Sequence, residues 1–196
     1  NLNLSNFDTS NVTNMSEMFS NQNIIGLDIH TFNTNNVTNM SGMFSNIGVS
    51  NLNLSNFDTS NVTNMSGMFS YARNLVSINL SSFNTSKVED MRSMFNAIGV
   101  SNIDLSNFNT SSVKQMDYMF QSLPNLTSLD LSNFDTSNVT SMMGMFSNSE
   151  KLNYLNLSSF NTSNVTNMYG LFNGCKSMTN YDLSNFNTSK VWSMAS

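Results

Sequence analysis

The chain has 196 residues, of which only 10% are charged, and its formal net charge is −5 at pH 7. With only 7 Lys and Arg, the chain has no basic patch for nucleic acid or anionic lipid. The lone Cys175 excludes an internal disulfide framework. No apolar run approaches the about 20 residues of a membrane span. Asn, Ser and Thr make up 88 residues, but 15 Phe and 16 Met can build a core, so the composition favours a binding or structural protein without a cofactor over an enzyme.

The whole chain is built from one repeated unit. The string NFDTSNVTNM at residues 6–15 returns unchanged at residues 56–65, and near-copies fill the rest of the chain. The first Phe of each unit recurs every 25 or 26 residues, at Phe7, Phe32, Phe57, Phe83, Phe108, Phe134, Phe160 and Phe186. About eight repeats therefore account for residues 1–196, which we expect to form a single segment. Because neither end carries an atypical capping unit, we expect this segment to belong to a longer array.

Each unit is expected to form a short strand, a short helix and a loop. Residues 129–131 alternate apolar and polar side chains, with the period of a strand that buries one face. Apolar residues then follow with the spacing of a helical stripe, at Val139, Met142, Met145 and Phe146. A Thr that all eight copies share, Thr136 in this unit, precedes the stripe and is expected to cap the helix. The segment that varies in length between units, which contains Pro124, is expected to be a surface loop.

A strand and a helix that recur every 25 or 26 residues predict an α/β repeat solenoid similar to leucine-rich repeats. The short strands of successive repeats would pair in a parallel sheet, and each strand and helix would bury one face against the other. The Phe, Met, Val and Leu columns are then expected to line a common core. We expect the methionines to fill that core and not to ligate a metal.

Two runs of the sequence resemble a known bacterial repeat. The runs FDTSNVTNMSGMF at residues 57–69 and LDLSNFDTS at residues 129–137 are similar to the BspA-like leucine-rich repeat of bacterial surface proteins, the variant that is also abundant in mycoplasma lipoproteins. The resemblance covers all 196 residues. The Gly-Cys pair that this family often has after the second Phe occurs once here, at Gly174 and Cys175. The resemblance implies an extracellular, cell-surface protein that adheres to host proteins, matrix or other bacteria.

Departures from the repeat are the candidates for a binding surface, because exposed Tyr, Trp and Arg are enriched at interface hot spots. These interaction candidates are Arg92, Asp117, Tyr118, Tyr154, Tyr169 and Trp192. Neutral variation at solvated positions is the alternative explanation for them. In the strands, Asp104 and Asp130 are expected to face solvent on neighbouring units, where a bound Ca²⁺ would relieve their repulsion. Two carboxylates fall short of the usual six to eight oxygen ligands of Ca²⁺.

Three classes of function remain open on the sequence. The favoured class is a non-catalytic surface module for adhesion or protein–protein interaction, whose partner is a host, matrix or other cell-surface protein. The alternative is a structural stalk or filament, in which near-identical units associate head to tail. Ice binding by Thr and Ser ladders is a distant third. No nucleophile–base pair or metal-ligand spacing connects His30 with Cys175, so we expect no enzymatic activity.

Overall fold

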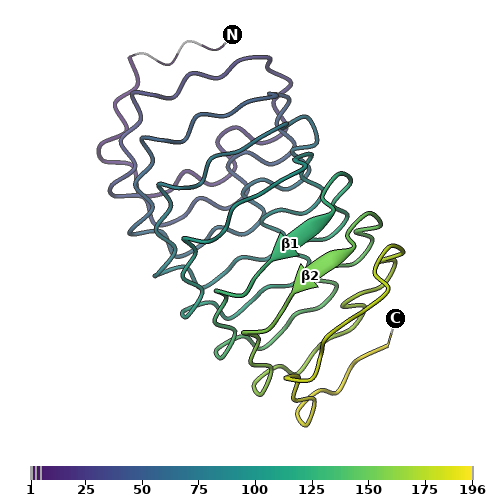
Figure 1. Ribbon diagram of the computed structural model, residues 1–196. Coiled ribbons are helices and arrows are strands. Elements are labelled where there is room, and N and C mark those ends of the chain that lie inside the picture. The colour runs from purple at the N-terminus through teal and green to yellow at the C-terminus, as the bar shows by residue number, and fades with distance from the viewer. Residues whose placement is uncertain (1, 3, 5, 196) are drawn as a thin grey trace.

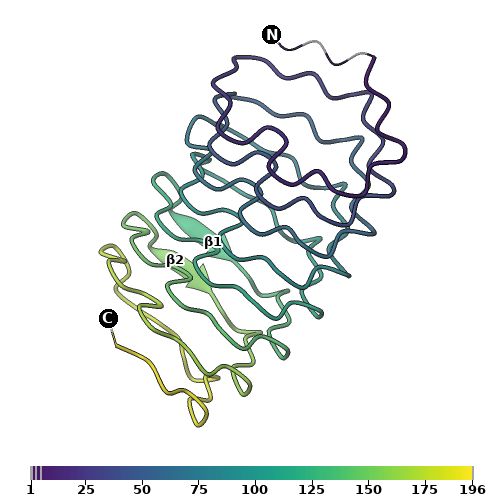
Figure 2. The same cartoon turned by 180° about the vertical axis from the view of Figure 1, so that it is seen from behind.

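The computed structural model describes residues 2, 4 and 6–195, which form one elongated stack of coils (Figure 1). Each coil is one sequence unit, and we number the coils 1 to 8 by their first Phe, from Phe7 to Phe186. Each coil pairs with the next through a parallel bridge at the same position of the unit, which joins in succession Asn14, Asn39, Asn64, Asp90, Gln115, Ser141, Asn167 and Ser193. Views from both sides show the coils following one another in chain order (Figures 1 and 2).

Regular strands occur in two neighbouring coils. β1 (Ser128–Asp130) and β2 (Tyr154–Asn156) pair in parallel, with Leu129 opposite Leu155. β1 overlaps the strand expected at residues 129–131. A parallel bridge between Leu2 and Leu27 joins the corresponding segments of coils 1 and 2. The strand side of each unit is therefore placed on the same side of the stack.

The prediction of a short helix in each unit is wrong, because the described residues contain no α-helix. In coil 6, two tight turns replace it, closed by hydrogen bonds from Val139 N to Thr136 O (2.9 Å) and from Met145 N to Met142 O (3.2 Å). The third residue of the second turn is Gly144, whose φ of 58° is left-handed and costs glycine no steric strain. Accordingly, the described part of the chain has no helix able to span a membrane.

In the inner coils the Phe, Met, Val and Leu columns are buried, as expected of the core, whereas Phe7 in coil 1 is 51% exposed. Phe57 is 2% exposed and Met65 is fully buried. The second Phe of the units forms a ladder of parallel rings, with centroids 5.7–6.0 Å apart and interplanar angles of 4–12°, through Phe19, Phe44, Phe69, Phe95, Phe120, Phe146 and Phe172. Because each ring contacts the rings of the coils on either side, burial in one coil depends on its neighbours.

The Thr shared by all units bonds one coil to the next and does not cap a helix. Thr85 is fully buried, and its hydroxyl donates to Asn109 O (2.8 Å) and accepts the Asn109 N–H (2.9 Å). The same hydroxyl-to-carbonyl bond runs to the following coil from Thr9, Thr34, Thr59, Thr110, Thr136 and Thr162. A hydroxyl can donate and accept at once, so one side chain satisfies two backbone groups. We call this column the Thr ladder.

In coils 3 to 8, the residue before the first Phe supplies a second set of bonds between coils. Asn133 Nδ2 donates to Leu105 O (3.0 Å) and Phe108 O (2.9 Å) of the preceding coil. Where Ser159 replaces Asn, its hydroxyl bonds the equivalent carbonyls. Regular sheet is short here, and backbone groups away from water need partners. The Asn- and Ser-rich composition therefore provides the polar contacts that a longer sheet would otherwise make.

Candidate functional site

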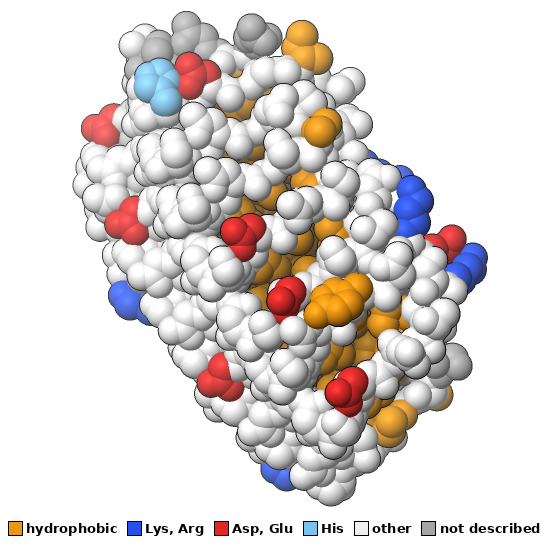
Figure 3. Space-filling view, in the orientation of Figure 1, with side chains coloured by type: hydrophobic (Ala, Val, Ile, Leu, Met, Phe, Trp, Pro, Cys, Tyr) orange, Lys and Arg blue, Asp and Glu red, His pale blue; other side chains and the backbone are white. Residues whose placement is uncertain are grey.

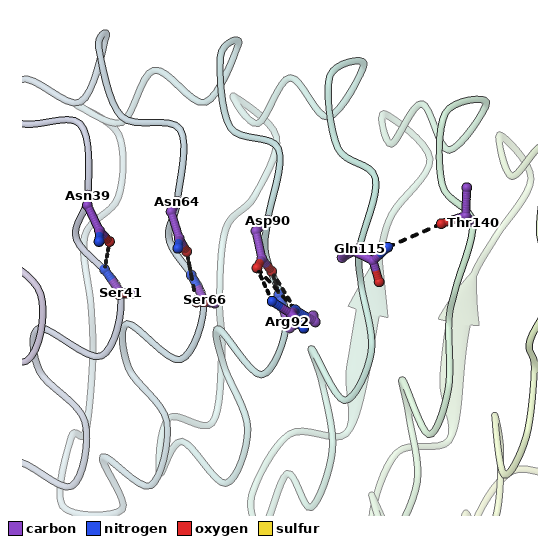
Figure 4. Close-up of polar contacts among 8 residues, drawn as sticks. All are labelled: Asn39, Ser41, Asn64, Ser66, Asp90, Arg92, Gln115 and Thr140. Carbon is purple, nitrogen blue, oxygen red and sulfur yellow. Dashed lines mark hydrogen bonds and ion pairs between the residues drawn. The ribbon is translucent and has the colours of Figure 1, made fainter.

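A groove of about 570 Å³ crosses the stack on the face formed by the second turns of the coils. We call it the turn-face groove. Its floor consists of Ser and Gly residues of coils 1 to 4, and its far end is formed by Arg92, Asp117 and Tyr118 of coils 4 and 5. Ser41, Ser66 and Arg92 follow one another at the same height on three successive coils (Figure 4). The structure thus brings together three of the six interaction candidates, which the sequence places up to 26 residues apart.

The charged groups at the far end are held in fixed orientations. Arg92 donates from Nε (3.0 Å) and Nη2 (2.6 Å) to Asp90, as Figure 4 shows. This hydrogen-bonded pairing, with a further contribution from the charge of Asp117, raises the pKa of Arg92. Asp117 Oδ1 accepts hydrogen bonds from Met143 N (2.7 Å) and from Ser141 Oγ. Within the described residues, Arg92 Nη1 and Asp117 Oδ2 make no hydrogen bond, so each of these anchored side chains keeps one polar atom available to a ligand.

Tyr118 closes the far end of the groove and borders a second hollow. Its φ is 59°, a left-handed value, and the equivalent position in several other coils is a left-handed Gly, as in Gly67 and Gly144. The ring lies against Gly144 of the next coil, because a Cβ built there would be 2.6 Å from two ring carbons. Beyond it, a hollow of about 190 Å³ is lined by Tyr118, Tyr169 and the intervening glycines Gly144 and Gly170. The candidate Tyr169, which is 50% exposed, therefore lies beside the groove and not in it.

Sequence reasoning missed two groove residues, Ser70 and Tyr71. Ser70 is only 7% exposed, and its hydroxyl makes no hydrogen bond within the described residues. The equivalent Ser147 is bonded by Gln121 Nε2 (2.9 Å) and in turn donates to the Gly144 carbonyl (2.9 Å). Tyr71 is 46% exposed at a φ of 58°. The same position is left-handed in other coils, where it holds Asn21, Asn46, Ala97, Ser122, Asn148 and Gly174. A large aromatic residue among these small ones was the available signal.

A second candidate surface, the strand face, consists of residues 26–30, 51–55, 77–81, 102–106, 128–132, 154–158 and 180–184. It has no Lys or Arg and four exposed carboxylates, those of Asp28, Asp104, Asp130 and Asp182. Figure 3 shows hydrophobic side chains in a hollowed stripe along the middle of the face, acidic side chains beside it, and Lys and Arg towards the margins. The strand-face segments also contain Ile78, Ile103 and Leu155, which are half-buried and pack against the core.

Tyr154 is the interaction candidate that lies on the strand face. It belongs to β2, and its side chain is 54% exposed. The neighbouring Asp130 accepts the backbone N–H of Ser132 (3.0 Å), and this hydrogen bond lowers the pKa of Asp130. The corresponding bond from Ser106 (3.0 Å) lowers the pKa of Asp104. The face is therefore anionic at neutral pH and below it.

The remaining candidates are the proposed Ca²⁺ pair, Trp192 and Cys175. Within the described residues, no group of three or more His, Cys, Asp or Glu could hold a metal ion, so Asp104 and Asp130 acquire no third ligand of this kind. Trp192 is 76% exposed in coil 8, away from both the turn-face groove and the strand face as defined above. Cys175 is buried, which raises the pKa of its thiol.

Comparison with known proteins assigns a family. A family model described as "Mycoplasma protein of unknown function, DUF285" matches residues 1–104 and 95–196. The chain belongs to the DUF285 family. No curated protein gives a significant match to this DUF285 chain.

Among solved structures, the DUF285 chain is similar to one described as the functional domain of InlJ from Listeria monocytogenes, which includes a cysteine ladder. The two are 13% identical with a TM-score of 0.25, over 97% of this chain and 49% of the InlJ chain. The DUF285 chain thus spans about half the length of the InlJ chain.

Proposed function

We propose that this chain is a non-catalytic, cell-surface binding segment that holds a basic protein partner on its strand face. The observation that carries the proposal is the charge of that face, where four exposed carboxylates occur without any Lys or Arg. Charge complementarity of this kind steers association and selects the partner more than it adds affinity. A partner surface with exposed Lys and Arg therefore fits the strand face.

Apolar contacts supply the remaining part of the proposed interaction. Tyr154 presents a large, half-exposed ring in β2, on the same face as the half-buried Ile103 and Leu155. Aromatic side chains with a polar tip are enriched among the residues that dominate binding energies. An apolar stripe flanked by charges also resembles the usual division of an interface into an apolar centre and a polar rim.

The location and partner class rest on sequence similarity. The DUF285 family is described as a mycoplasma family, which supports the mycoplasma part of the resemblance to BspA-like repeats. We interpret the coils as a variant of the leucine-rich-repeat solenoid in which two turns replace the helix. On this basis the partner is a host, matrix or other cell-surface protein, and the role is adhesion.

Substitutions that reproduce residues of other coils test this proposal without disturbing the stack. Asp104→Asn with Asp130→Asn introduces the amide found at the same position in Asn53 and Asn79, and Tyr154→Ser introduces the residue of coil 6. Binding to immobilised matrix and host surface proteins is measured by surface plasmon resonance at low and high salt. We expect binding that weakens with salt, is reduced by the double Asn variant and is reduced further by Tyr154→Ser.

A matched control removes the same charge from another face. Asp58→Asn with Asp135→Asn also introduces residues found at that position in other coils, namely Asn33 and Asn84. The control pair is expected to leave binding unchanged. An equal loss of binding in both double variants, or no binding to any of these proteins, would refute the proposed role of the strand face.

A structural stalk is the second candidate, and the uniform bonding between coils favours it. The Thr ladder and the parallel bridges repeat along the stack with the same partners. Identical joints of this kind suit a spacer that bears load along its length, and head-to-tail association would extend it. Sizing of the purified chain over a range of concentrations tests this candidate, because a stalk that self-associates gives species that lengthen with concentration.

A further inference from the structure

We propose that the turn-face groove binds a linear, uncharged oligosaccharide laid along the stack. The groove spans coils 1 to 6, and its volume of about 570 Å³ lies in the range of small-ligand sites. Neighbouring coils are about 4.8 Å apart where they pair, a step close to the length of one sugar unit in an extended glycan. A chain-like ligand with repeating units therefore matches a floor with repeating side chains.

The floor of the groove offers side-chain hydroxyls and no free backbone groups. Its backbone is bonded from coil to coil, for example from Gly42 N to Ser66 O (2.8 Å) and from Gly67 N to Arg92 O (2.7 Å). An extended peptide that binds by adding a strand needs such groups unpaired. Within the described residues, the hydroxyls of Ser41, Ser45 and Ser93 make no hydrogen bond, so they can donate to and accept from the hydroxyls of a sugar.

Ser70 adds one more hydroxyl to the floor of the groove. The residue is 7% exposed and lines the groove, and its hydroxyl makes no hydrogen bond within the described residues. No side-chain polar atom there is both buried and without a partner, so the Ser70 hydroxyl is open to the groove. A ligand hydroxyl that enters the groove above Ser70 can therefore bond to it.

The far end of the groove offers polar groups for the hydroxyls of a sugar and aromatic rings for its apolar C–H face. Arg92 Nη1 can donate and Asp117 Oδ2 can accept, and both are held in place by the bonds of their neighbouring atoms. Tyr71 and Tyr118 provide aromatic rings against which the apolar C–H face of a sugar can pack. Both tyrosines have left-handed φ values, as do the equivalent residues of other coils, which include Ser93 and Ala97 as well as Gly and Asn.

The charges of the groove argue against an ionic ligand. Glu17 and Asp117 line it, and the charge of Arg92 is matched by Asp90. The excess of negative charge disfavours uronates and other anions. A cationic ligand is not favoured either, because the two unpaired carboxylates lie four coils apart and Asp117 is already bonded by Ser141 and Met143.

Titration calorimetry on the whole 196-residue chain tests the proposal. The neutral probes are cellohexaose, maltohexaose, mannohexaose and hexa-N-acetylchitohexaose, and the charged probes are hexagalacturonate and hexalysine. We expect at least one neutral probe to bind and neither charged probe to compete with it. Binding of a charged probe in its place, or of no neutral probe, would overturn the proposal.

Two groove variants and one control locate the binding. Tyr71→Asn and Tyr118→Gly introduce residues that the same columns hold in other coils, so the fold is expected to persist, which circular dichroism checks. Each is expected to weaken binding about tenfold, and Ser70→Ala by a smaller factor. Tyr154→Ser on the strand face is expected to change nothing, which separates this site from the proposed protein-binding face. Unchanged affinity in both Tyr71→Asn and Tyr118→Gly refutes the groove as the site.

Discussion

Replacement of a single buried hydroxyl in the Thr ladder is expected to destabilise the whole stack. Thr85→Val keeps the branched shape of the side chain but removes both bonds to Asn109, the 2.8 Å bond to its carbonyl and the 2.9 Å bond from its N–H. A buried donor or acceptor left without a partner costs about 1–3 kcal/mol. Because Asn109 is itself exposed, we take the low end for each group. The expected loss in the free energy of unfolding is therefore about 2–3 kcal/mol.

Urea denaturation followed by circular dichroism measures this loss, and for a chain of this size it corresponds to a fall of roughly 4–12 °C in Tm. Thr188→Val is the matched control, because Thr188 lies in coil 8, is exposed, and makes no hydroxyl hydrogen bond within the described residues. We expect it to change stability by less than about 0.5 kcal/mol. Equal losses in the two variants, or no loss in Thr85→Val, would refute the idea that the ladder couples the coils.

Three further predictions concern turns, pH and the thiol. Ser93→Gly removes left-handed strain at a φ of 55° and should stabilise the chain by about 1 kcal/mol in urea denaturation, whereas Gly67→Ser should cost as much. The pKa values of Asp104 and Asp130 are lowered in the fold. Their contribution to stability is therefore present above the ordinary pKa of 3.8 and is lost as pH falls below it. Melting temperatures of the variant with Asp104→Asn and Asp130→Asn should accordingly fall less in acid than those of the original chain. Burial raises the pKa of Cys175, so a thiol reagent should react slowly until urea unfolds the chain, and immediate reaction would contradict this.

The repeat and its core could be predicted because both depend on side-chain type at a fixed period. Phe57 and Met65 belong to columns of large apolar residues, and such columns are buried in any stack of equivalent units. The conformation between these columns could not be predicted in the same way. The spacing of Val139, Met142 and Met145 suits a helix, but two successive turns with a left-handed Gly144 bury the same side chains.

The candidate sites could be predicted only in part, for a related reason. Arg92, Asp117 and Tyr118 stand out as departures from the repeat, and departures are visible in one sequence. That they share a groove with Ser70 depends on how the turns of successive coils stack, which one sequence unit does not show. Tyr154 stands out equally but lies on the strand face, and the period of the sequence alone does not separate the two faces.

Each joint of the Thr ladder uses the same chemistry, a Thr hydroxyl against the backbone of the residue that follows a first Phe. Excision of residues 32–56 would set Asp58 against Thr9 in place of Thr34 and leave a joint of the same kind. Gain or loss of complete coils through recombination between near-identical segments therefore requires no new contact to evolve. Such events would alter the length of the stack and the number of sugar units that the turn-face groove can bind.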